Sequence, residues 1–123
     1  MHSSPTTAEL TVAVGQFDVV DDWQVNATKV EDMIERATDK AVDLLVLPEG
    51  VMARFMDRKE QIRQAAQPVD GPFVRRIQQF TAERTLTVIF GIHESNDEAR
   101  PYNTLDHLLN CSRWRFSRSF IYW

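Results

Sequence analysis

The clearest structural signal in the chain lies at residues 42–49, which run Val42-Asp43-Leu44-Leu45-Val46-Leu47-Pro48-Glu49. Five of the first six are branched aliphatics, and so short an apolar run is typical of a strand buried on both faces in a helix-covered sheet. Pro48 has no N–H group to donate, so we expect the strand to end there. Glu49 is therefore predicted to lie at the carboxyl end of an inner strand, where α/β sheets bind their ligands.

This position makes Glu49 the candidate catalytic residue. A carboxylate at that edge can be screened from bulk water, and a screened carboxylate can serve as a general base. The alternative is structural, because a glutamate after a strand can also face solvent or cap the next helix. Position alone leaves both interpretations open.

Length and composition limit the class of protein. The 123 residues suffice for one domain with a modest core, and 43% hydrophobic with 26% charged residues is ordinary for a globular protein. No run approaches the roughly 20 apolar residues of a membrane helix, and the N-terminus lacks a signal-peptide pattern. Cys111 is the one cysteine, which agrees with a reducing compartment. We predict a cytoplasmic chain with no membrane partner.

The distribution of charge argues against nucleic-acid binding. Residues 100–123 contain four arginines and one aspartate, whereas residues 1–99 contain 10 basic and 17 acidic side chains. Most of the chain would therefore repel a phosphate backbone.

The segments around residues 42–49 predict a βαβ unit. Residues 10–17 are rich in β-branched side chains and predict a strand after a flexible leader at residues 1–9. Asp21 or Asp22 is suited to cap a helix that starts at Trp23. The apolar side chains of that helix recur at helical spacing, at Trp23, Ala27, Val30, Ile34, Ala37 and Ala41. Two strands joined by a helix predict parallel pairing.

The later segments predict two more helices and two more strands. Residues 50–56 should form a loop that lines the site or packs beneath it, and residues 57–67 should be helical. Pro72 suits the first position of another helix, with Phe73, Ile77, Phe80 and Arg84 on one face. Residues 86–92 and 102–109 predict strands. Residues 114–123 hold five of the 12 aromatic residues and alternate with polar ones, which is compatible with an edge strand.

Several ordered motifs together resemble the N-terminal part of the nitrilase, or carbon–nitrogen hydrolase, superfamily. They are Val12-Ala13-Val14-Gly15-Gln16-Phe17, Asn26, Leu45-Val46-Leu47-Pro48-Glu49, Asp70-Gly71-Pro72 and Tyr102-Asn103-Thr104-Leu105. The chain most resembles the amidase-like branch that includes deaminated glutathione amidase and omega-amidase. The resemblance runs from about Leu10 to Leu105.

The resemblance implies an α/β fold that forms the N-terminal part of an α-β-β-α sandwich. It also implies a hydrolytic reaction. Members of the family hydrolyse an amide or nitrile with a Glu, a Lys and a Cys and without a metal or cofactor. The Glu activates the thiol, the thiolate attacks the carbon, and the Lys stabilises the oxyanion. Glu49 matches the general base. The substrate-binding residues remain unknown, and members of the family often assemble through their faces.

The family's Lys and Cys have no match here. No lysine follows Lys59, and Cys111 comes too early and lacks the motif that follows the family's cysteine. We therefore predict a partial hydrolase domain at residues 10–109 and a non-family tail at residues 110–123, as in a truncated or frameshifted product. Such a chain should be inactive alone.

Two other hypotheses stay open. The chain could be a non-catalytic interaction module that pairs with itself or with another chain through an exposed sheet. It could also be an unrelated ligand-binding α/β domain. His93-Glu94 looks like half a metal site, but we interpret it as a solvent-facing pair because no second pair of ligands follows. Arg54 could meet an acidic substrate group, and a surface role is the alternative.

Overall fold

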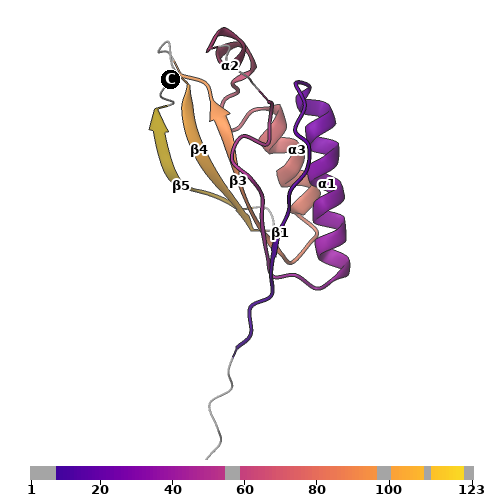
Figure 1. The fold of residues 1–123 in the computed structure, drawn as a ribbon. Helices are drawn as coiled ribbons and strands as arrows, with labels where there is room; N and C mark the ends of the chain where they lie inside the picture. The colour runs from indigo at the N-terminus through magenta and orange to yellow at the C-terminus, as the bar shows by residue number, and fades with distance from the viewer. Residues whose placement is uncertain (1–7, 55–58, 97–100, 110–111, 121–123) are drawn as a thin grey trace, which may run out of the picture.

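The described residues form a five-stranded sheet with three helices (Figure 1). The computed structural model describes residues 8–54, 59–96, 101–109 and 112–120. In chain order the elements are β1 (Val12–Val14), α1 (Trp23–Asp39), β2 (Leu44–Val46), α2 (Lys59–Ala65), α3 (Pro72–Thr81), β3 (Thr87–Glu94), β4 (Tyr102–Leu109) and β5 (Ser112–Phe120). No helix in this part of the chain is long and apolar enough to cross a membrane.

The strands lie in the sheet in the same order as in the chain. β1, β2 and β3 pair in parallel, and β3, β4 and β5 pair in antiparallel. The predicted α/β class and the parallel βαβ pairing are therefore confirmed. The first two strands are shorter than predicted, with three residues each.

α1 begins where the sequence predicts. The Asp22 side chain caps it by accepting hydrogen bonds from the N–H groups of Gln24 at 2.8 Å and Val25 at 3.4 Å. The predicted apolar stripe is buried as far as Ala37. Ala41 was predicted to continue it and does not, because the helix ends at Asp39 and Ala41 is exposed with φ of 54°.

α3 starts at Pro72 as predicted and packs beside α1. The rings of Trp23 and Phe73 meet edge to face with centroids 6.4 Å apart. The prediction for Arg84 is wrong in part, because α3 ends at Thr81 and Arg84 lies beyond it. Its guanidinium nevertheless covers the Phe80 ring, 3.8 Å from the centroid.

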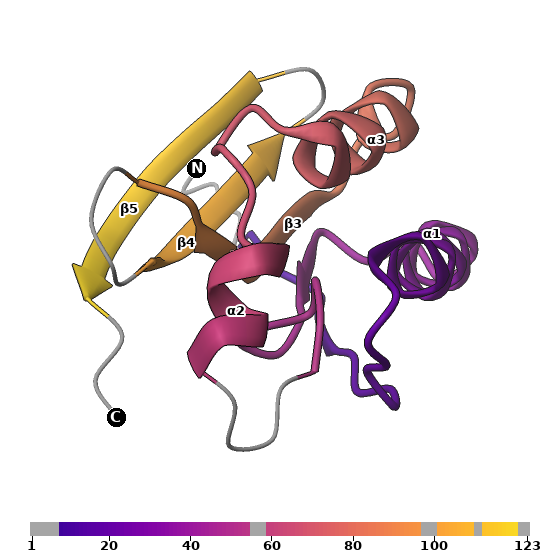
Figure 2. The same ribbon diagram turned by 90° about the horizontal axis from the view of Figure 1, so that it is seen from above.

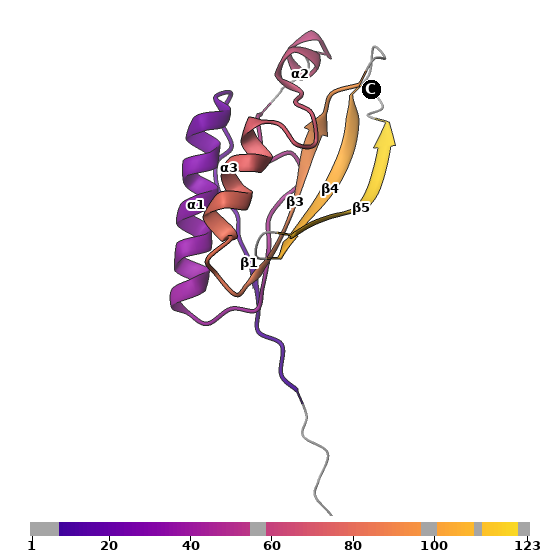
Figure 3. The ribbon, with the colours of Figure 1, turned by 180° about the vertical axis from the view of Figure 1, so that it is seen from behind.

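The described helices α1 and α3 cover one face of the sheet (Figures 1 and 3). Leu45, Val88 and Phe90 point to this face and are buried with the helices in a single hydrophobic core. On the opposite face Leu44 and Val46 are half-buried, while Val12 and Val14 are 49% and 76% exposed. The prediction that the strand at residues 42–47 is buried on both faces is therefore wrong for the described part of the chain.

The remaining helix, α2, lies at one end of the sheet rather than on a face (Figure 2). The loop before it packs into the core as predicted, with Val51 and Met52 fully buried. At the other edge, β5 pairs with β4, which confirms an edge strand in the aromatic segment. Whether residues 1–9 form a leader and residues 110–123 a non-family tail stays a prediction.

The cap on α1 makes a testable difference between two neighbouring aspartates. Replacing Asp22 with Ala removes the acceptor for two N–H groups at the start of the helix and should lower the free energy of unfolding by about 1 kcal/mol. Asp21→Ala removes an equally exposed carboxylate that does not cap the helix and should change it by less than about 0.5 kcal/mol. Urea unfolding of both variants measures the difference, and equal losses would contradict the assignment.

Candidate functional site

Glu49 follows β2 at the end of the sheet that the sequence predicts. The Leu47 N–H donates to the Ile89 carbonyl at 2.9 Å, which carries the pairing with β3 one residue beyond the strand. Residues 49–52 then form a turn. The Glu49 side chain is exposed in the described part of the chain, so it is not screened from bulk water there.

Two glycines let this turn lie directly on β3. Gly50 has φ of 69°, a left-handed backbone conformation that residues other than glycine rarely adopt. A Cβ atom placed on Gly91 would lie 3.2 Å from the Glu49 Cα and 3.4 Å from the Gly50 nitrogen. The backbone of the turn therefore approaches β3 so closely that a Cβ atom at position 91 would make tighter contacts than most Cβ atoms do.

Asn103 on β4 holds the Glu49 carboxylate. Its side-chain Nδ2 donates a hydrogen bond to Glu49 Oε1 at 2.6 Å, and it faces His93 in the register of β3 and β4. Asn103 belongs to the Tyr102-Asn103-Thr104-Leu105 motif of the resemblance, and the structure places its amide on the candidate base. A bond to an ionised acceptor is among the stronger hydrogen bonds in proteins, so it can orient an exposed carboxylate.

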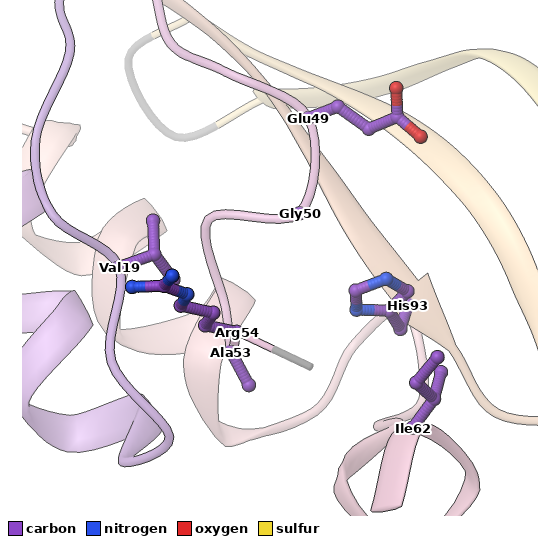
Figure 4. A pocket seen from close by; sticks show the side chains of 7 residues that line it. All are labelled: Val19, Glu49, Gly50, Ala53, Arg54, Ile62 and His93. Atoms are coloured by element: carbon purple, nitrogen blue, oxygen red, sulfur yellow. The ribbon is translucent and has the colours of Figure 1, made fainter. Parts of the chain in front are cut away.

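A pocket of about 380 Å³ opens beside Glu49. It is lined by Val19, Glu49, Gly50, Ala53, Arg54, Ile62 and His93 (Figure 4). The figure shows Glu49 and His93 on one side of the pocket and Arg54 on the other. Arg54 also pairs with Asp18 at 3.4 Å, with both side chains largely exposed, so the pair adds little to stability.

Asn26 on α1 ties together the loops that surround the pocket. It is fully buried, accepts from the Val20 N–H at 2.9 Å, and donates to the carbonyls of Val20 and Met52 at 2.7 and 2.8 Å. One amide therefore fixes the loop after β1 to the loop after β2. This gives a physical reason for the asparagine that the resemblance singled out.

His93 and Glu94 point to opposite faces of β3. The Glu94 side chain faces the helices, is 6% exposed, and accepts a hydrogen bond from Thr104 Oγ1 at 2.7 Å. His93 is half-buried and lines the pocket. The interpretation of the two as a solvent-facing pair is wrong, because strand alternation separates them and both are shielded. The alternation of side chains along a strand is the sequence signal that could have separated His93 from Glu94. Pairing with β4 then places His93 on the same face as Asn103.

Burial changes the proton affinity of His93. Desolvation lowers the pKa of the imidazole below its usual value, and the nearby negative charge of Glu49 offsets part of that effect. A lowered pKa means that the imidazole is neutral near pH 7. Within the described residues, no group of three or more His, Cys, Asp or Glu side chains is arranged to hold a metal ion.

Among the described residues, the lining of this pocket contains no cysteine that could serve as the nucleophile and no lysine that could stabilise an oxyanion. Cys111 lies outside the described residues, and no lysine lines the pocket. The arrangement provides an oriented carboxylate, an imidazole and a guanidinium around a cavity large enough for a small substrate.

These features define an α/β protein with a pocket at the carboxyl ends of its parallel strands. The family model described as carbon-nitrogen hydrolase matches residues 11–108, so the chain belongs to the carbon–nitrogen hydrolase family.

Two curated relatives agree with this assignment. Deaminated glutathione amidase of Escherichia coli O157:H7 is 32% identical over 94 residues, which are 76% of this chain and 36% of that protein. A hydrolase of Mycobacterium tuberculosis H37Rv is 31% identical over 94 residues, 76% of this chain and 32% of its own length. The chain thus spans about a third of the length of the curated relatives it matches.

Solved structures show the same fold. A CN-hydrolase superfamily protein from Xanthomonas campestris superposes with a TM-score of 0.75 at 18% identity, over 89% of this chain and 40% of that one. Saccharomyces cerevisiae Nit3, a nitrilase-superfamily member, superposes with a TM-score of 0.69 at 20% identity, over 86% of this chain and 43% of its own. The predicted nitrilase-like fold is therefore confirmed.

The buried amide of Asn26 should be costly to remove. Asn26→Ala leaves the Met52 carbonyl and both polar backbone groups of Val20 without this partner, and should lower the free energy of unfolding by about 2 to 3 kcal/mol. Asp32→Ala, an exposed site on the same helix, is the matched control and should change it by less than about 0.5 kcal/mol. Chemical unfolding measures both, and a loss for Asn26→Ala no larger than the control would show that the amide does not fix the loops.

Proposed function

We propose that this chain supplies the general base, Glu49, of a carbon–nitrogen hydrolase that acts on a small linear amide or nitrile. The observation that carries the proposal is the hydrogen bond from Asn103 to Glu49 Oε1 at 2.6 Å, in the wall of a 380 Å³ pocket. The 32% identity to a deaminated glutathione amidase supports an amide over a nitrile.

The bond to Asn103 suits a carboxylate that must accept a proton. Asn103 donates to Oε1 and restricts the orientation of the carboxylate, and Oε2 remains an acceptor for the proton of a nucleophile. Asn103 is neutral and leaves the negative charge of the base in place. A lysine at that position would instead pair with the charge and weaken the base.

The rest of the reaction needs groups that the matched positions do not supply. In the family's chemistry, Glu removes the proton of a cysteine thiol, the thiolate attacks the amide carbon, and a lysine stabilises the oxyanion. In these 123 residues no lysine follows Lys59, and Cys111 does not match the nucleophile. We therefore propose that the 123-residue chain alone does not turn over an amide.

The first test compares the isolated chain with a chimera. The purified 123-residue chain should release no ammonia from linear amides. A chimera of residues 1–108 with the part of E. coli deaminated glutathione amidase that this chain does not cover should hydrolyse that amidase's substrate. Within the chimera, Glu49→Gln should lower kcat about 10²–10⁴-fold, because a general base contributes roughly that factor.

The control for this test is Glu60→Gln in the same chimera. Glu60 is an exposed carboxylate on α2 and is not part of the pocket lining, so its loss should leave kcat within about twofold. Hydrolysis by the isolated chain that Glu49→Gln abolishes would overturn the inactivity proposal. A folded chimera whose activity survives Glu49→Gln would overturn the assignment of the base.

A second candidate function is favoured by the uncovered face of the sheet. In the described part of the chain, this open face is formed by alternate residues of β1 to β3: Val12, Val14, Leu44, Val46, Thr87 and Ile89. Val12 and Val14 are 49% and 76% exposed, which is unusual for valines in adjacent outward positions of a strand. We propose that a second chain packs on this face, either another copy or a different subunit.

The oligomeric state tests this second function. In light scattering after size exclusion, the measured mass should rise with protein concentration. Association would remove the apolar side chains of the open face from water, which is favourable. Val14→Glu should reduce that rise. Val25→Glu is the matched control, since Val25 is 42% exposed on α1 and away from the open face. A monomeric mass at every concentration would contradict self-association.

A further inference from the structure

His93 lines the pocket beside Glu49 but has no part in the general-base step above, and the role assigned to it here rests on the proposed role of Glu49. His93 lies two residues after Gly91 on β3, on the same face of the sheet, and directly opposite Asn103 in the register with β4. The turn that carries Glu49 passes over this part of β3. A Cβ atom on Gly50 would lie 3.4 Å from His93 Cε1, so the imidazole lies beside the turn.

Two neighbouring strands therefore hold Glu49 in different ways. β4 provides the hydrogen bond from Asn103 to Glu49 Oε1, and β3 provides the packing of His93 against Gly50. His93 and Asn103 lie opposite each other across the two strands. A change in His93 therefore affects the surroundings of the carboxylate that Asn103 binds.

We propose that His93 is a positioning residue for Glu49: the neutral imidazole supports the Glu49–Gly50 turn, and the protonated imidazolium competes with Asn103 for the carboxylate. In the neutral form, the base meets an amide donor and an uncharged ring and keeps its negative charge. In the protonated form, the positive charge of the imidazolium stabilises the Glu49 carboxylate. The carboxylate is then a weaker base and accepts a proton less readily.

The surrounding charges leave Glu49 as the group that responds. Among the described residues that line the pocket with His93, the charged ones are Glu49 and Arg54, and Arg54 pairs with Asp18. α2 contributes uncharged Ile62 to the pocket, and its Glu60 and Arg63 pair with each other at 3.1 Å. β4 contributes neutral Asn103.

The sign of the coupling follows from these neighbours. Burial holds the pKa of His93 below 6.5, and the charge of Glu49 acts in the opposite direction. Removing the Glu49 charge takes away the one effect that raises the pKa. The imidazole of the Glu49→Gln variant should therefore titrate at a lower pH than that of the wild-type chain.

The experiment is a pH titration of the isotope-labelled 123-residue chain by NMR, with His93 assigned from a His93→Gln variant. The wild-type His93 signals should titrate below pH 6.5, and Glu49→Gln should shift the midpoint to lower pH. Glu60→Gln removes an exposed carboxylate outside the pocket and should leave the midpoint where it is. Equal midpoints in the wild-type and Glu49→Gln chains would overturn the proposal.

A second readout separates positioning from mere packing. The side-chain amide signals of Asn103 report its bond to Glu49, and in the wild-type chain they should move in a step that coincides with the titration of His93. His93→Gln keeps a neutral polar side chain and should abolish that step while leaving the Asn103 signals at neutral pH near their wild-type positions. His93→Ala removes the support and should shift them at neutral pH.

The outcomes are independent of the hydrolase assignment. If the Asn103 signals do not follow His93, or if the step persists in His93→Gln, then His93 does not act on Glu49 and the proposal fails. If the titrations behave as expected but the chimera keeps its activity in Glu49→Gln, then the coupling stands and the assignment of the base fails.

Discussion

The position of Glu49 depends on a close approach of two backbones. The turn after β2 rests on β3 where Gly91 has no side chain, since a Cβ atom there would come within 3.2 Å of the Glu49 Cα. This contact sets Gly50 against His93 and brings the Glu49 carboxylate within reach of Asn103, one strand further on. A Cβ atom at position 91 would require the turn to shift by a few tenths of an ångström.

The sheet has two faces with different environments, and this asymmetry explains several features at once. The face under α1 and α3 holds the core, with Leu45, Val88 and Phe90 buried there. The other face carries half-buried and exposed aliphatic side chains as well as the residues around Glu49. Burial on this open face is incomplete, which is why Glu49 remains in contact with water although it follows an inner strand of the sheet.

Much of the fold could be predicted because it is encoded locally. The apolar period of α1, the cap at Asp22 and the proline at the start of α3 act within a few residues of themselves, and the structure confirms them. Glu49 was placed correctly at the strand end for the same reason. The choice between a screened and a solvent-facing Glu49 stayed open, because burial depends on what covers the second face, and no local pattern carries that information. Arg84 and Ala41 were misplaced because helix ends depend on backbone conformations that the apolar period does not record.

The site also shows why residue spacing has to be considered in pairs of strands. Along β3 and β4, one set of alternate residues enters the core, where Glu94 accepts from Thr104, and the other set surrounds Glu49. His93 and Glu94 adjoin in sequence yet serve opposite faces, so their adjacency carries no chemical meaning. His93 and Asn103 are ten residues apart yet face each other across the strands. A slip of one residue in β4 would turn Asn103 toward the core and Thr104 away from Glu94, so the register itself specifies which polar side chains reach the pocket.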